Sequence, residues 1–150
     1  MKAVIQRCTS ASVIADGVPS GKVKKGFLIL LGVLKGDETV DADLLAEKIS
    51  KLRVFDDSDG KLNLSLKDVG GEVLVVSNFT LGADYRKGNR PDYFASEAPA
   101  RANELYEYFV GAMRERGIHA ETGVFGADMK ISLEADGPVT ITMDSTVLKK

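Results

Sequence analysis

Two short apolar runs place the tightest limit on the fold of this chain. One extends from Phe27 to Val33 and the other from Val73 to Val76, and neither alternates polar with apolar residues. Strands that are buried on both faces have this pattern, whereas a membrane helix needs roughly 20 consecutive apolar residues. We therefore predict two strands at the centre of a sheet, and no segment that enters a membrane.

Both ends of the chain also predict strands. The β-forming residues from Ala3 to Ile14 precede Asp16-Gly17, a tight-turn signal, so the chain should open with a hairpin. Further β-forming runs predict strands at 118–122, 129–133 and 139–143. A turn at Asp136-Gly137-Pro138 is expected between the last two.

Helical spacing of apolar residues appears in two segments. Residues 41–52 predict one helix, whose first turn Thr39 or Asp41 could cap. Residues 102–113 predict a second helix that stops at Gly117. Strand runs with only these two helices favour an α+β fold over a doubly wound one. We expect a curved, barrel-like β-sheet system with two main helices packed outside.

Length, composition and cysteine content bound the domain count and the compartment. A chain of 150 residues, 44% apolar and 28% charged, is typical of one soluble globular domain covering 1–150. Cys8 is the single cysteine, which excludes an intramolecular disulfide and a multi-thiolate metal site and favours the cytoplasm. Short sheet edges on such a fold invite pairing with a second copy, as in a homodimer.

Charge argues against broad binding of nucleic-acid phosphates, because the net charge is −2. Two local basic clusters remain, and each is more often a solvated surface than a phosphate site: Lys22, Lys24 and Lys25, and Arg86, Lys87 and Arg90.

The usual signatures of a hydrolase are missing from the sequence. His119 is the single histidine, and there is no Gly-x-Ser-x-Gly elbow, His-Glu-x-x-His pair or phosphate-binding loop. The acidic run at 56–60 is similar to a calcium loop, but Phe55 stands where its first ligand should be, so a turn is predicted. What remains is hydroxyls and glycines at strand ends, namely Ser77, Thr80 and Gly137-Pro138, which by themselves more often satisfy backbone groups or make turns.

Two motifs nevertheless resemble a known family. Ser77-Asn78-Phe79-Thr80 resembles the Ser-Gln-Phe-Thr motif of D-aminoacyl-tRNA deacylases, and Ala135-Asp136-Gly137-Pro138-Val139-Thr140 resembles their Asn-x-Gly-Pro-Val-Thr motif. Segments at 5–7, 73–76, 86–91 and 123–129 follow the family's order and spacing. Two positions depart from it: Asn78 has one methylene less than the family's Gln, and Ala135 lacks the hydrogen-bonding side chain of the family's Asn.

The resemblance implies an esterase without metal or cofactor that acts on D-aminoacyl-tRNA, and on glycyl-tRNA mischarged on tRNA(Ala). Its catalytic residues would be Ser77, Asn78, Phe79 and Thr80. The amides near Phe79 and Thr80 would stabilise the tetrahedral oxyanion, and one such donor is typically worth ~3 kcal/mol. The ribose 2′-hydroxyl would assist, which leaves Thr80 a positioning role; Thr80 as nucleophile is the alternative.

The resemblance also implies how substrates are sorted. A Gly137-cis-Pro138 pair from the partner subunit of a homodimer would exclude L-residues sterically, and Arg7 would orient it. Phe125 and Met129 would hold the terminal adenosine by stacking and apolar contact. The loop with Arg86, Lys87 and Arg90 is our candidate for contact with the tRNA backbone.

Two other functions remain open from the sequence. The two motif departures would suit a non-catalytic module on the same fold that binds the tRNA end. A serine or threonine esterase for small molecules would instead use His119 as its base. His119→Ala should abolish activity only in that last case.

Overall fold

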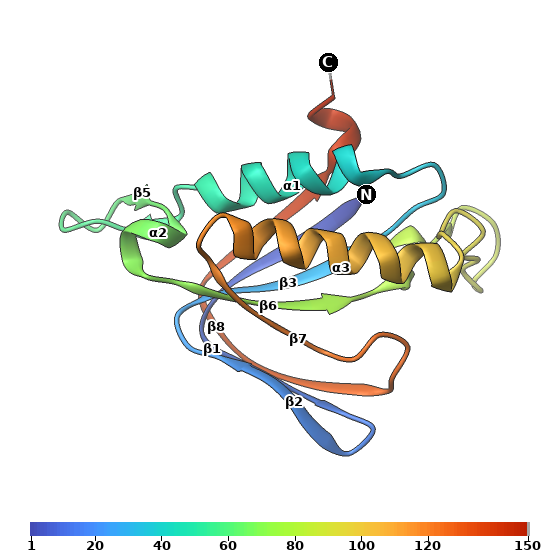
Figure 1. Cartoon of the computed structure of the whole chain (residues 1–150), viewed down its shortest axis with the longest axis horizontal. Helices are drawn as coiled ribbons and strands as arrows, with labels where there is room; N and C mark the ends of the chain where they lie inside the picture. The colour runs from blue at the N-terminus through green and yellow to red at the C-terminus, as the bar shows by residue number, and fades with distance from the viewer. Residues whose placement is uncertain (150) are drawn as a thin grey trace.

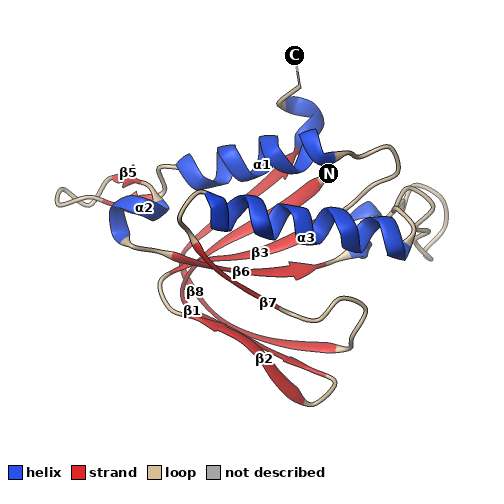
Figure 2. Cartoon of the chain, viewed as in Figure 1, coloured by secondary structure: helices blue, strands red, loops and turns tan. Residues whose placement is uncertain are grey.

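A strongly curved mixed sheet carries the fold in this computed structural model, which describes residues 1–149 (Figures 1 and 2). The elements in chain order are β1 (Lys2–Ala15), β2 (Val18–Val23), β3 (Gly26–Gly32), α1 (Thr39–Lys51), β4 (Phe55–Asp56), β5 (Leu62–Leu64), α2 (Leu66–Val69), β6 (Glu72–Ser77), η1 (Phe79–Gly82), α3 (Pro99–Glu115), β7 (His119–Thr122), β8 (Met129–Asp144) and η2 (Ser145–Val147). The main sheet has the order β2-β1-β3-β6-β7, and β8 pairs with β1.

The two apolar runs form the centre of this sheet, as predicted. β3 lies between β1, to which it is antiparallel, and β6, to which it is parallel. Phe27, Ile29 and Val75 are fully buried. Because Leu31 pairs with Ser77, the polar end of β6 lies beside the end of β3.

Helices α1 and α3 lie side by side across one face of the sheet (Figure 2). Leu45 and Ile49 of α1 and Leu105 and Phe109 of α3 are fully buried in the core between helices and sheet. Both predicted helices are therefore confirmed. Glu38, which was not predicted, is the N-cap residue, and the predicted Asp41 side chain accepts the Glu38 amide in a capping box.

The sheet curls until its two sides nearly meet, which confirms a barrel-like α+β fold. The Ser20 hydroxyl of β2 donates to the Thr122 carbonyl of β7 over 2.9 Å. Gly21 permits this approach, because a Cβ there would lie 2.6 Å from the same carbonyl oxygen. A second, smaller cluster of buried side chains fills the curl, including Cys8, Val13 and Leu74.

The C-terminal part of the sheet differs from the prediction. One long strand, β8, replaces the two strands expected at 129–133 and 139–143. The Asp136-Gly137-Pro138 segment interrupts the register between the pairs Gln6–Thr140 and Cys8–Ala135 without reversing the chain. β1 pairs with β8 on both sides of the interruption, so the partner strand overrides the local turn signal. Proline has no amide to donate to a neighbouring strand, and it is tolerated at such a bulge because the regular ladder of hydrogen bonds is interrupted there.

Short elements fill the region between α1 and β6. The turn predicted at 56–60 is confirmed, since the Asp57 carboxylate accepts the amides of Asp59 and Lys61 there. The strand β5 and the single-turn helix α2 were not predicted. Ser65 caps α2, and its side chain accepts the Asp68 amide.

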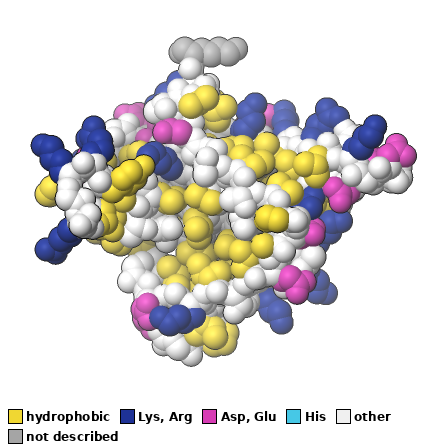
Figure 3. Space-filling view, turned by 180° about the vertical axis from the view of Figure 1, so that it is seen from behind, with side chains coloured by type: hydrophobic (Ala, Val, Ile, Leu, Met, Phe, Trp, Pro, Cys, Tyr) yellow, Lys and Arg dark blue, Asp and Glu magenta, His cyan; other side chains and the backbone are white. Residues whose placement is uncertain are grey.

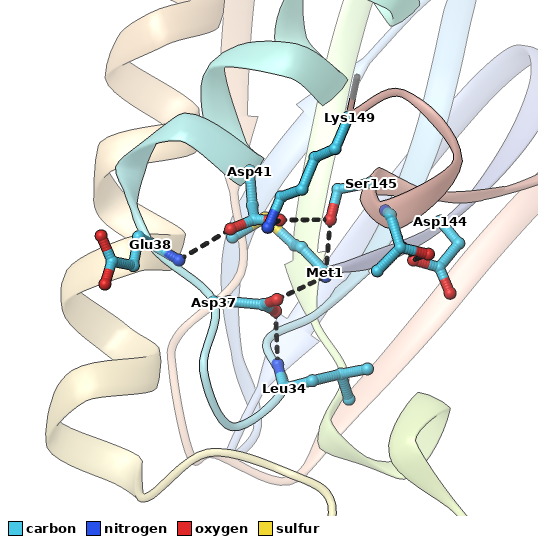
Figure 4. Close-up of polar contacts among 9 residues, drawn as sticks. Met1, Leu34, Asp37, Glu38, Asp41, Asp144, Ser145 and Lys149 are labelled. Carbon is cyan, nitrogen blue, oxygen red and sulfur yellow. Dashed lines mark hydrogen bonds and ion pairs between the residues drawn. The ribbon is translucent and has the colours of Figure 1, made fainter.

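A buried polar cluster joins both ends of the described chain to α1 (Figure 4). The Met1 amine contacts the Asp37 carboxylate at 2.7 Å and the Ser145 hydroxyl at 2.9 Å. Asp41, at the start of α1, accepts hydrogen bonds from Ser145 and from the Glu38 amide and pairs with Lys149 at 2.9 Å. Burial by itself would raise the pKa of Asp41, but the hydrogen bonds and the Lys149 charge lower it by more, so the pKa is about 2.

Within residues 1–149, no helix is both long and apolar enough to cross a membrane.

Candidate active site

A pocket of about 700 Å³ opens where β6 ends. Ser77, Asn78 and Phe79 line one side of it, and Phe125 and Met129 line another. The chain reaches this edge because β6 is held between β3 and β7, and then turns away in η1. The wall of the pocket is mostly apolar. Its other lining residues are Val33, Lys35, Tyr93, Phe94, Ser96, Glu97, Ala98, Pro99, Ala102, Gly126 and Ala127.

The turn from β6 into η1 leaves two main-chain donors beside the pocket. The Asn78 amide bonds to the Leu31 carbonyl at 2.8 Å, and the Leu81 amide bonds to the Asn78 carbonyl. The amides of Phe79 and Thr80 come between them, at the start of η1, where helical amides have no partner within the helix. They have no hydrogen-bond acceptor among residues 1–149.

Phe79 is held from outside η1. The Ser96 hydroxyl donates to the Phe79 carbonyl at 2.7 Å. The rings of Phe79 and Tyr93 meet edge to face, with ring centroids 5.1 Å apart. Gly82 has no room for a side chain because Ser96 occupies that space. The main chain that carries the two free amides is therefore fixed by neighbouring residues.

Thr80 lies at the edge of this group, outside the pocket lining. Its hydroxyl donates to the side-chain oxygen of Asn78. His119 lies at the other end of β6, paired with Glu72, about 16 Å along the strand from Ser77. It contacts Glu121 at 3.1 Å and is exposed. This geometry does not place His119 as a base for Ser77 or Thr80.

Arg7, Gly137 and Pro138 form a second group, on β1 and β8. Arg7 is only 6% exposed, and its guanidinium donates to the carbonyls of Asp136 at 3.1 Å and Val54 at 2.8 Å. The Gly137-Pro138 peptide bond is cis, and both residues are exposed. Ala135, one of the two motif departures, pairs with Cys8 in the same stretch.

The two groups lie far apart within one chain. Arg7 pairs with Phe27, which pairs with Val73, and Val73 lies about 13 Å along β6 from Ser77. Across the sheet, the path β8-β1-β3-β6 adds three strand spacings, or about 14 Å. The structure thus brings Ser77, Asn78, Phe79, Phe125 and Met129 together, and leaves the Gly-Pro pair three strands away across the sheet.

The basic loop between η1 and α3 is partly neutralised. The Arg86 guanidinium donates two hydrogen bonds to the Asp84 carboxylate, over 2.9 and 2.7 Å. These hydrogen bonds lower the pKa of Asp84 to about 2. In the described chain, 1–149, Lys87 and Arg90 form no ion pair. Two of the three predicted cations are therefore available to an anionic partner.

Sequence reasoning missed part of the pocket lining and a buried residue that packs against Phe125. Tyr93, Phe94 and Ser96 come from the turn-rich segment after Gly82, and Tyr106 was assigned only to the apolar stripe of α3. Only the structure supplies the signal. Phe94 is a large apolar side chain that is 79% exposed, and Tyr106 is a buried tyrosine whose hydroxyl is hydrogen-bonded. Along the part of the chain the structure describes, no group of three or more His, Cys, Asp or Glu could hold a metal ion.

Comparison with solved structures defines the class of fold. One chain described as a c-Myc DNA Unwinding Element Binding Protein superposes with a TM-score of 0.90 and 37% identity, covering 96% of this chain and 98% of that one. Another, from a structural analysis of a probable eukaryotic D-amino acid tRNA deacylase, has a TM-score of 0.78 at 17% identity, covering 95% and 97%. The second shares the fold alone.

Sequence comparison then gives the family. The family model described as D-Tyr-tRNA(Tyr) deacylase matches residues 4–144, and the chain belongs to that family. Curated relatives named D-aminoacyl-tRNA deacylase include one from Thermosipho melanesiensis, 55% identical over 97% of both chains. Another, from Thermus aquaticus, is 56% identical over 97% of this chain and 96% of the relative.

Proposed function

We propose that the protein hydrolyses the ester bond of D-aminoacyl-tRNA, releasing the free D-amino acid and tRNA. Its family membership supports this activity. The single structural observation that carries it is the pair of unpartnered amides at Phe79 and Thr80 beside an apolar pocket. Donors fixed at the start of a turn are suited to an oxyanion, because they need not reorganise when the charge develops.

The reaction needs no side-chain nucleophile or base, because an aminoacyl ester is already activated. A water attacks the ester carbonyl with assistance from the 2′-hydroxyl of the terminal ribose, and the two amides bind the oxyanion. The bond between the acyl carbon and the ribose oxygen then breaks, and that oxygen leaves with a proton. One such donor is typically worth ~3 kcal/mol. Ser77, Asn78 and Thr80 position the acyl group, and Phe125 and Met129 contact the terminal adenosine.

Chiral selection requires a second copy in this proposal. The exposed Gly137-Pro138 main chain of one subunit enters the pocket of the other, and Arg7 supports it through the Asp136 carbonyl. An L-residue would drive its side chain into this backbone, a D-residue points its side chain away, and glycine is accepted. Apolar side chains across the face seen from behind in Figure 3 are suited to such a homodimer.

Glycyl-tRNA mischarged on tRNA(Ala) is a second substrate under the same scheme, because glycine has no side chain to collide. We place the reaction in the cytoplasm, where aminoacyl-tRNA is made. Lys87 and Arg90 contact the tRNA backbone, and Arg86 contributes less because Asp84 already neutralises it.

A deacylation assay with D-Tyr-tRNA and L-Tyr-tRNA tests the proposal. Hydrolysis of the D-ester alone is expected. Binding of both without turnover would instead support a non-catalytic module for the tRNA end. The observation favouring that second candidate is Asn78, which replaces the family's Gln and whose side-chain oxygen is occupied by Thr80.

A further inference from the structure

The Val75 carbonyl of β6 accepts two hydrogen bonds. The Tyr106 hydroxyl of α3 donates one over 2.7 Å, and the Gly123 amide donates the other over 3.3 Å. Val75 pairs with Thr122, the last residue of β7, so this carbonyl marks the point where the segment 123–128 leaves the sheet. Tyr106, only 4% exposed, thus reaches from the helix layer to the root of that segment.

The same tyrosine supports the ring that enters the pocket. Phe125 packs against the Tyr106 ring, with centroids 6.1 Å apart and planes at 48°. The far end of the segment is fixed separately, because the Asp16 amide donates to the Asp128 carbonyl at 2.8 Å. Between these two anchors, Tyr106 is the aromatic support of Phe125 in the described chain.

Gly123 completes the arrangement on the other side of the root. A Cβ on Gly123 would lie 2.6 Å from the sulfur of Met129, so glycine lets Met129 pack against the root of the segment. Phe125 and Met129 line the pocket together. Their placement therefore depends on what holds residue 123.

We propose that Tyr106 is a positioning residue for the terminal nucleoside of the substrate, which acts by fixing Phe125 both through the root at Gly123 and through the contact between the two rings. This inference rests on the proposed function, which assigns Phe125 and Met129 to the terminal adenosine. Burial raises the pKa of Tyr106 to about 12, so its hydroxyl remains a donor across the working range of pH. The two contacts of Tyr106 fix the stacking surface before substrate arrives.

Tyr106→Phe tests this inference because it keeps the ring and removes the bond to Val75. A net hydrogen bond is worth about 1 kcal/mol, so KM for D-Tyr-tRNA should rise about fivefold while kcat stays within twofold. Tyr108→Phe is the matched control. It lies on the same helix and also loses a hydroxyl bond, to Asp43 at 3.0 Å, but is 41% exposed, so KM should not change.

A double-mutant cycle with Phe125→Ala separates positioning from general destabilisation. If Tyr106 acts through Phe125, the double variant should have nearly the KM of Phe125→Ala alone. Rises in KM that multiply, or a lower melting temperature with unchanged KM in Tyr106→Phe, would overturn the inference. Should Tyr106→Phe not fold, Gly123→Ala carries the test, and an unchanged KM there overturns it. A wild-type protein that fails to deacylate D-Tyr-tRNA would instead overturn the proposed function itself.

Discussion

The hydroxyl of Thr80 is held by the side-chain oxygen of Asn78, and His119 lies about 16 Å away along β6. A serine or threonine nucleophile needs a base within hydrogen-bond reach. Neither Ser77 nor Thr80 has a histidine in that position. At the residue scale, the site therefore offers main-chain donors and shape more than side-chain chemistry.

Thr80→Ala distinguishes these roles. If Thr80 only positions the acyl group, loss of its hydroxyl removes about 1 kcal/mol, and kcat for D-Tyr-tRNA should fall no more than about tenfold. A nucleophile would instead lose activity by many orders of magnitude. Single-turnover deacylation measures the difference, and His119→Ala, expected to have the wild-type rate, serves as the control for the esterase reading.

Pro138 should decide chirality without taking part in the chemistry. In Pro138→Ala, the main chain that the partner subunit would insert under the proposal loses its fixed φ angle. Hydrolysis of L-Tyr-tRNA should rise at least tenfold, while the D-ester rate changes by less than threefold. Pro19→Ala, on β2, is the matched control. Unaltered discrimination in Pro138→Ala would refute the assignment of this residue.

At the scale of elements, the central strands and both long helices could be predicted because their own patterns determine them. The runs at Phe27 and Val73 are apolar without alternation, and α3 has a clear apolar stripe. β8 could not be predicted, because Gly137-Pro138 is locally a turn and only pairing with β1 keeps the strand continuous. For the candidate site, the strand-end motif predicted Ser77, Asn78 and Phe79, which line the pocket. The contact of Tyr106 with Val75 could not be predicted, because it depends on a helix packed against β6.

Mixing two defective variants tests whether β8 of one subunit serves the pocket of the other. Phe125→Ala impairs the pocket, and Pro138→Ala impairs selection. A heterodimer of the two contains one site with an intact pocket and an intact proline from the second copy. After mixing and re-equilibration, the ratio of L-Tyr-tRNA to D-Tyr-tRNA hydrolysis should therefore fall below that of Pro138→Ala alone. An unchanged ratio despite heterodimer formation, checked by native mass spectrometry, would contradict a site shared between subunits.

At the scale of the whole molecule, the cluster in Figure 4 joins the ends of the described chain to the helix layer. Asp41 is fully buried and ionised, with a pKa of about 2 against an ordinary 3.8. A carboxyl with a lowered folded-state pKa contributes stability above its unfolded pKa and loses that contribution as pH falls toward the folded value. The relevant window runs from about pH 4 down to about pH 2.

Asp41→Asn should remove this pH dependence. The shift corresponds to about 2 kcal/mol of unfolding free energy at neutral pH, which the variant should lose. Between pH 4 and pH 2, the wild type should lose stability more steeply than the variant. Urea denaturation at pH 5, 3 and 2 measures both slopes, and parallel slopes would show that Asp41 is not responsible.

The separation of the Gly-Pro pair from the pocket of the same chain, three strands across the sheet, has a further consequence under the shared-site proposal. Discrimination between D- and L-aminoacyl-tRNA then depends on the concentration of the protein. A lone protomer keeps its oxyanion donors but has no wall against mirror-image substrates, so dilution below the dimer dissociation constant should make the enzyme indiscriminate before it becomes inactive. Cells that synthesise too little of this protein would then hydrolyse L-aminoacyl-tRNA, which is correctly charged, and would also remove D-aminoacyl-tRNA slowly.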